Sequence, residues 1–98
     1  MYIDSMNRNN SNSTEARIRE MAVVFSKIND PDTMIRFFEE IFTQAERKDI
    51  SLRWELMKRL KQGVPQRKIA YDLGISLCKI TRGAKIIKNP KSVTNQII

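Results

Sequence analysis

Positively charged side chains are the groups in this sequence best suited to binding chemistry, and most of them lie in its second half. Residues 1–55 hold 8 Lys and Arg against 10 Asp and Glu, whereas residues 56–98 hold 10 Lys and Arg against Asp72 alone. The net charge of +7 is therefore concentrated in one part of the chain. This asymmetry indicates a polyanionic partner, and nucleic acid fits it better than a membrane surface.

Catalysis and metal binding have little support. The chain contains no histidine and a single cysteine, Cys78. These counts exclude an intrachain disulfide and an ordinary zinc site, because structural zinc is held mainly by Cys and His. No acid and nucleophile are paired in an arrangement suited to proton transfer. We therefore expect no enzyme activity, no metal and no enzyme cofactor.

Length and hydropathy predict a small protein without a membrane anchor. With 98 residues, of which 41% are hydrophobic, the chain is expected to form one domain with a modest core. No apolar run is long enough to cross a bilayer, and residues 1–10 lack the apolar core of a signal peptide. We expect a cytoplasmic protein that gains stability by dimerisation.

Two short helical patterns within residues 65–88 are expected to position the basic groups. In the first, Ile69, Ala70 and Leu73 form one apolar stripe. Gly74 then supplies the positive φ that a tight turn needs. The arrangement predicts a helix-turn-helix, the form of a DNA-binding head. A generic two-helix corner of an all-α domain would share this spacing and is the alternative.

The second helix of this head is expected to carry basic residues on its outer face. Residues at spacings of three and four are predicted to point inward, and these are Leu77, Ile80, Ala84 and Ile87. The predicted outward residues are Cys78, Lys79, Arg82 and Lys85. Ser76 is the expected N-cap of this helix. Small Ala70 and Gly83 are expected to let the two helices of the head cross closely.

The first half of the chain is predicted to contribute two helices after a flexible arm at residues 1–12, which is rich in Asn and Ser. The first helix begins after the expected N-cap Ser13, and its narrow apolar seam fits either a core or a dimer interface. Asp30 and Pro31 open the second helix, which is apolar around most of its circumference. Such a helix needs more partner surface than one small chain supplies, which favours a homodimer.

A long helix of roughly 19 residues is predicted to follow Thr43, which forms a capping box with Glu46. Its apolar stripe comprises Ile50, Trp54, Met57 and Leu60, broadened by Leu56, and we expect Trp54 in the core. Arg53 lies inside this stripe, where an unpaired charge is costly. Either its guanidinium extends past its neighbours to solvent, or it lines a pocket for an anion.

These patterns divide the chain into a helical core and dimerisation region at 13–64, the head at 65–88 and a tail at 89–98. The tail is too short for more than a marginal turn, although its Val93, Ile97 and Ile98 could pack on a partner.

Two segments resemble the tryptophan repressor family: FTQAERKDISLRW at 42–54 and QRKIAYDLGISLCKITRGAKIIK at 66–88. The most specific matches are T-x-x-E-R, which starts at Thr43, and I-T-R-G, which starts at Ile80. The resemblance implies an all-α, intertwined homodimer that represses transcription by binding operator DNA. It also implies L-tryptophan as a corepressor, bound between the long helix and the second helix of the head.

The resemblance further implies which residues hold the ligand: Glu40, Phe42, Thr43, Arg53, Arg82, Gly83 and Ile86. Arg53 and Arg82 would lie on either side of the indole ring, where a guanidinium can stack and also pair with a carboxylate. Thr43 would lie near that carboxylate, the carbonyls of Glu40 and Phe42 would receive the ammonium group, and Gly83 would allow close approach. Ile86 replaces the family's small or hydroxyl residue and cannot bind an ammonium group. A family-related regulator with another effector, or with none, is therefore the alternative.

The residues expected at the DNA fall into two groups. Gln66, Arg67 and Lys68 begin the first helix of the head and are predicted to bind phosphates. Residues near the start of the second helix are predicted to approach base edges, and these are Ser76, Leu77, Cys78, Lys79 and Thr81. Lys79 is the candidate for guanine. An alternative from another class is a basic helical module that binds RNA or an acidic protein.

Overall fold

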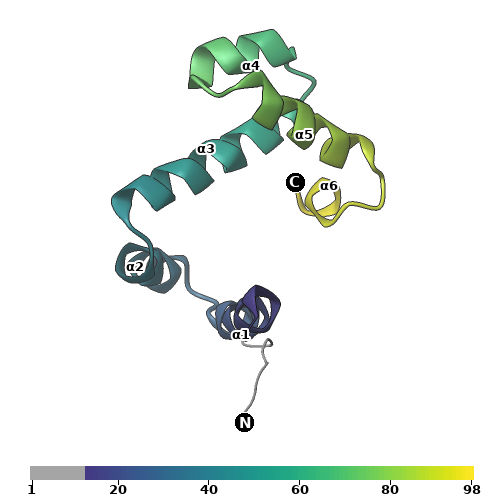
Figure 1. Ribbon diagram of the computed structural model, residues 1–98. Helices are drawn as coiled ribbons and strands as arrows, with labels where there is room; N and C mark the ends of the chain where they lie inside the picture. Colours follow the sequence, from purple (N-terminus) through teal and green to yellow (C-terminus); the bar gives the residue numbers. More distant parts are fainter. Residues whose placement is uncertain (1–12) are drawn as a thin grey trace. The chain divides into compact units, whose positions relative to one another are not determined.

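The computed structural model describes residues 13–98, which are entirely helical apart from their connections (Figure 1). The helices in chain order are α1 (Thr14–Lys27), α2 (Pro31–Ile41), α3 (Gln44–Lys61), α4 (Gln66–Leu73), α5 (Leu77–Lys88) and α6 (Val93–Ile97). The predicted all-α fold is confirmed. The chain separates into two compact units, Met1–Ile41 and Phe42–Ile98. The predicted flexible arm at residues 1–12 lies outside the described residues.

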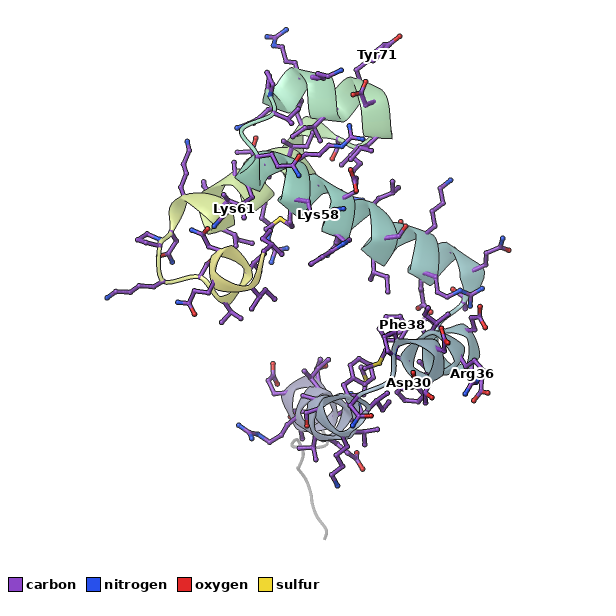
Figure 2. All side chains as sticks on the ribbon, turned by 180° about the vertical axis from the view of Figure 1, so that it is seen from behind. Asp30, Arg36, Phe38, Lys58, Lys61 and Tyr71 are labelled. Carbon is purple, nitrogen blue, oxygen red and sulfur yellow. The ribbon has the colours of Figure 1, made fainter. Side chains whose placement is uncertain are left out.

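The first unit contains α1 and α2, and local hydrogen bonds fix where each begins. Ser13 caps α1 by accepting a hydrogen bond from the backbone N–H of Ala16 at 3.2 Å. Asp30 Oδ2 accepts from the backbone N–H of Thr33 at 3.0 Å and from its hydroxyl at 2.7 Å (Figure 2). These two bonds lower the pKa of Asp30, because they stabilise its carboxylate. Both predicted helix starts are confirmed.

Aromatic contacts hold α1 against α2. The ring of Phe25 meets that of Phe37 edge to face at a centroid distance of 5.4 Å, and that of Phe38 lies 5.6 Å away. No residue of either helix is buried, and Ile35 of α2 is 54% exposed. The single chain therefore leaves much of the apolar surface of α2 open to solvent.

The second unit is built on α3, with α4 and α5 packed over its C-terminal half (Figure 1). Leu56 of α3, Ile69 of α4 and Ile80 of α5 form its buried centre. Partly buried apolar residues surround them: Met57, Leu60, Val64, Ala70, Leu73 and Ile75. The stripe predicted for the first helix of the head is confirmed by this packing.

Caps and left-handed residues set the bounds of α3 and α4, and the capping box and the turn at Gly74 are as predicted. Thr43 and Glu46 form both bonds of the capping box: the Glu46 N–H donates to Thr43 Oγ1 at 3.2 Å, and the Thr43 N–H donates to Glu46 Oε1 at 2.9 Å. Gly63 has φ 84° and Gly74 has φ 63°. Gly74 therefore makes the tight turn between α4 and α5. Helix α3 is 18 residues long.

Two burial predictions are wrong. Trp54, expected in the core, is 50% exposed, because it lies two residues before the buried Leu56 and so, at about 3.6 residues per turn, on nearly the opposite side of α3. Leu77, expected to point inward, is 52% exposed, because it lies in the first turn of α5, beyond the edge of the core that holds Ile80 and Ala84.

The close helix crossing also differs from the expected one. A Cβ on Gly83 would lie 3.0 Å from Leu60 Cδ1 and 3.1 Å from Met57 Sδ, both on α3. Gly83 therefore permits α5 to approach α3, rather than α4 as predicted. Because Gly83 has no side chain, α3 and α5 can pack closely at this position.

The tail forms a short helix where only a marginal turn was expected. Ser92 caps α6 by accepting from the Asn95 N–H at 2.9 Å. The Asn95 amide donates to the carbonyl oxygens of Ile87 at 2.8 Å and Asn89 at 3.2 Å. Lys61 Nζ donates to the Asn95 carbonyl at 2.7 Å and also to its side-chain oxygen (Figure 2). Asn95 thus attaches α6 to the ends of α3 and α5.

Candidate ligand site and nucleic-acid surface

A cavity of about 210 Å³ lies between α3 and α5. Its lining comprises Arg53, Leu56 and Met57 from α3, with Lys79, Arg82, Gly83 and Ile86 from α5. In each helix these positions recur at intervals of three and four, so each helix offers one face to the cavity. Gly83, where α5 lies close to α3, is one of the lining residues.

The structure brings together four of the residues predicted to hold the ligand: Arg53, Arg82, Gly83 and Ile86 all line this cavity. Thr43 does not, because it caps the N-terminus of α3, about 15 Å from Arg53 along the helix axis at 1.5 Å per residue. Phe42 directly precedes it, and Glu40 belongs to the α1–α2 unit.

The predicted polar groups at the start of α3 already have local partners. The carbonyl oxygen of Phe42 accepts a hydrogen bond from Arg47 Nη1 at 2.6 Å. The Thr43 hydroxyl accepts the capping bond from Glu46. Within one chain, neither group is placed at the cavity.

The electrostatics of the cavity favour an anion. Its lining includes three cations, Arg53, Lys79 and Arg82, and no carboxylate. Within residues 13–98 none of the three forms an ion pair. Removing any part of these charges from water without a counter-charge is costly, so a bound carboxylate would be stabilised here.

In contrast to the unpaired cations of the cavity, the neighbouring cations Lys58 and Arg59 of α3 form ion pairs. Glu55 binds Arg59 Nε at 2.8 Å and Lys58 Nζ at 3.3 Å (Figure 2). Arg59 and then Lys58 lower the pKa of Glu55 by hydrogen bonding to its carboxylate. Arg59 also reaches Asp72 of α4 at 3.2 Å, which ties α4 to α3.

Three lining residues were absent from the ligand set predicted from the sequence. Leu56 and Met57 give the cavity its apolar walls, and Lys79 adds a third cation. The spacing of Leu56 and Met57, three and four residues after Arg53, was the available signal. Lys79 had been predicted only as a DNA-reading residue.

All eight residues predicted at the DNA are exposed: Gln66, Arg67, Lys68, Ser76, Leu77, Cys78, Lys79 and Thr81. The first three form the opening turn of α4, and the others surround the start of α5. Ser76 is the N-cap of α5, as predicted, and accepts from the Lys79 N–H at 3.4 Å. Lys68 pairs with Asp72 at 3.1 Å, so a phosphate would compete with that carboxylate.

The outer face of α5 and the cavity behind it share a residue. A shallow groove on α5 is lined by Leu77, Cys78, Thr81, Arg82 and Lys85. Arg82 therefore borders both this groove and the cavity. Lys85 belongs to the same outer face but was not among the predicted DNA contacts.

Between residues 13 and 98, no three His, Cys, Asp or Glu side chains are grouped so that they could hold a metal ion. None of the helices α1 to α6 is both long and apolar enough to cross a membrane.

Comparison with known proteins places this chain in a family. The model of the family described as Trp repressor protein matches residues 16–98. Trp operon repressor homologs of Chlamydia trachomatis serovars D and L2 are 30% identical over 78 residues, which cover 79% of this chain and 83% of each relative. The homolog of Chlamydia caviae is 34% identical over 64 residues, which cover 64% of this chain and 63% of that relative. No solved structure matches the chain. The match over residues 16–98 and the similarity to these homologs show that the chain belongs to the Trp repressor family.

Proposed function

We propose that this member of the Trp repressor family represses transcription as a homodimer whose α4–α5 pairs bind operator DNA when L-tryptophan occupies the cavity between α3 and α5. Family membership supports a transcriptional repressor. The observation that carries the finer proposal is that α5 serves two surfaces. One face lines the cationic cavity, and the other is exposed with the predicted base-reading residues.

The cavity suits a ligand that combines a carboxylate with a flat apolar ring. Leu56, Met57 and Ile86 provide apolar walls, while Arg53 and Arg82 provide guanidinium groups that can pair with a carboxylate or stack on a ring. Its volume of about 210 Å³ is below the roughly 300–1,000 Å³ of pockets for drug-sized molecules. An aromatic amino acid is therefore a better match than a larger cofactor.

The exposed start of α5 and the first turn of α4 support DNA as the partner. In the proposed complex Gln66, Arg67 and Lys68 bind phosphates, while the first residues of α5 enter the major groove. Residues 56–98, which contain α4 and α5, carry 10 Lys and Arg and a single acid, Asp72. That distribution favours nucleic acid over an acidic protein.

A homodimer would cover the apolar surface that one chain leaves open. Trp54, Ile35 and Ile41 are all about half exposed, on α3 and α2. Monomeric soluble proteins rarely expose so many large apolar side chains, and a second copy is the usual cover. A second copy also offers a way for Thr43 to reach a ligand, because within one chain it lies about 15 Å from Arg53 along the helix axis at 1.5 Å per residue.

The proposed mechanism is a shift between populations of the dimer. A ligand that fills the space behind α5 favours the arrangement in which both α5 helices meet successive major grooves. Without the ligand, three unpaired cations face one cavity and disfavour that arrangement. Ligand binding and DNA binding are then coupled, by a factor of about 5 to 150 if the coupling has the usual strength.

The test begins with selection of DNA by the purified full chain. A pool of random duplexes is selected at millimolar L-tryptophan, and the affinity for the enriched duplex is measured by fluorescence anisotropy with and without L-tryptophan. The proposal expects enrichment of one sequence and tighter binding with the ligand. If one sequence is enriched but binds equally well with and without L-tryptophan, the chain would instead be a DNA-binding regulator with another effector or with none. Ile86, which stands where the family has a small or hydroxyl residue, is the reason for that alternative.

A second arm distinguishes DNA from RNA. Anisotropy with the enriched duplex and with a structured RNA of equal length is followed over a salt titration. The proposal expects tighter binding to the duplex at every salt concentration. Tighter binding to the RNA, with no duplex enriched from the pool, would support the basic RNA-binding module instead.

A further inference from the structure

The cavity between α3 and α5 adjoins a second cavity of about 290 Å³ beside the turn that precedes α5. Its lining comprises Asp49, Leu52, Arg53, Leu56, Gly74, Ile75, Ser76 and Lys79. Arg53, Leu56 and Lys79 line both cavities, so the two meet along these side chains. A ligand in the first cavity can therefore extend a polar end toward the second.

Asp49 is the single acid that lines either cavity. It precedes Arg53 by four residues on α3, a spacing at which opposite charges on a helix ordinarily pair. The two side chains do not pair, and within residues 13–98 neither has another ion-pair partner. An unpaired carboxylate and unpaired cations thus border the same space.

This charge arrangement matches a molecule that carries both signs on adjacent atoms. We propose that Asp49 accepts the α-ammonium group of an amino-acid ligand whose carboxylate binds Arg53 and whose ring lies in the first cavity. The inference rests on the proposed function, since it assigns a further contact to the same ligand. Because the ammonium and carboxylate groups share one α-carbon, both must lie where the two cavities meet.

Within one chain, the rest of the lining offers the ammonium group no other carboxylate. The first cavity is lined by Ile86, whose side chain has no acceptor, and by cations that repel an ammonium group. The Phe42 carbonyl, predicted to receive it, directly precedes the N-cap of α3 and lines neither cavity within one chain. Asp49 therefore makes the ligand's amino group a determinant of affinity even with isoleucine at position 86.

Calorimetry with two probes tests the role of Asp49 in the full chain. The probes are L-tryptophan and indole-3-propionic acid, which has hydrogen in place of the amino group. The proteins are the parent chain, Asp49→Asn and the control Glu20→Gln, which removes one negative charge from exposed α1. Asparagine keeps the size of the side chain but removes the charge that would hold the ammonium group.

The expected result is a loss confined to one protein and one probe. Asp49→Asn should bind L-tryptophan about tenfold to a hundredfold more weakly than the parent, since a hydrogen bond between charged groups is lost. Its affinity for indole-3-propionic acid should be unchanged or higher, and Glu20→Gln should match the parent with both probes.

Each other result overturns the inference in a recognisable way. Unchanged L-tryptophan binding by Asp49→Asn means that Asp49 does not contact the amino group, although the proposed ligand stands. Equal losses with both probes mean that Asp49 supports the cavity and not the ammonium group. Equal losses in Glu20→Gln mean that net charge is the cause. No binding by the parent removes tryptophan from the proposed function as well, whereas selection of DNA tests the rest of that function separately.

Discussion

Replacing Gly83 by alanine tests the close contact between α5 and α3 beside the cavity that these two helices line. A Cβ at this position would lie 3.0 Å from Leu60 Cδ1, 3.1 Å from Met57 Sδ and 3.6 Å from Leu56 Cδ2. The first two distances are shorter than ordinary van der Waals contact, so the side chains of Leu60 and Met57 must move by a few tenths of an ångström. Met57 also lines the cavity, which couples this movement to ligand binding.

Two opposing effects set the expected change in stability. Alanine in place of glycine inside a helix contributes about 1 kcal/mol through helix propensity. Crowding a packed contact by one methyl group costs about 1–3 kcal/mol. The net expectation is a loss of about 0–2 kcal/mol in the free energy of unfolding. If holding Met57 in place for the ligand costs about 1 kcal/mol, affinity for L-tryptophan falls roughly fivefold.

Urea unfolding and calorimetric titration with L-tryptophan measure these two quantities. Gly63→Ala is the matched control, because Gly63 has φ 84° and an added Cβ meets no atom within 4 Å. It should lose stability through backbone strain of about 1–3 kcal/mol without a change in ligand affinity. A Gly83→Ala chain that gains the full 1 kcal/mol or so of helix propensity and binds the ligand like the parent would refute the reasoning.

Three further predictions concern DNA, pH and assembly. At saturating L-tryptophan, Lys79→Ala should weaken binding to the selected duplex more than to a scrambled one, whereas Lys68→Ala should weaken both about equally. If anisotropy gives the same ratio of losses on the two duplexes for both variants, the assigned roles are contradicted. The pKa of Glu55 is lowered by Arg59 and Lys58, so its stabilisation is complete above the ordinary value of 4.5 and is lost as the pH falls through the lowered pKa. Thermal unfolding of Glu55→Gln should therefore depend less on pH in that acid range than unfolding of the parent, and parallel curves would count against the ion pairs. Sedimentation equilibrium should give twice 11.5 kDa for the parent and a smaller mass for Ile35→Lys, and a parent mass near 11.5 kDa would exclude the dimer at that concentration.

Features set by neighbours in the sequence could be predicted from the sequence. The capping box at Thr43, the cap at Asp30 and the left-handed turn at Gly74 each depend on residues within a few positions. The starts of α1, α2, α3 and α5 followed from the same kind of signal. The family resemblance predicted that Arg53 and Arg82 contact the same ligand, and both residues line the cavity between α3 and α5.

Features set by packing between distant segments could not be predicted in this way. The exposure of Trp54 depends on which face of α3 is covered by α4 and α5, which periodicity within α3 does not specify. Gly83 marked a close crossing, but the identity of the facing helix requires the tertiary arrangement. Asn95 attaches α6 through bonds to Ile87 and Asn89, and the local composition of the tail gave no sign of them. Asp49 lines a cavity that shares Arg53 and Lys79 with the first cavity, an arrangement that spacing within α3 does not specify.

The central claim, that a ligand behind α5 controls DNA binding by its outer face, is tested most directly by measuring the coupling from both sides. Calorimetry gives the affinity for L-tryptophan with and without the selected duplex, and anisotropy gives the affinity for the duplex with and without L-tryptophan. Linkage requires both affinities to change by the same factor, which we predict to be about fivefold or more. L-tryptophan that binds equally well to the free protein and to the DNA complex would contradict the account.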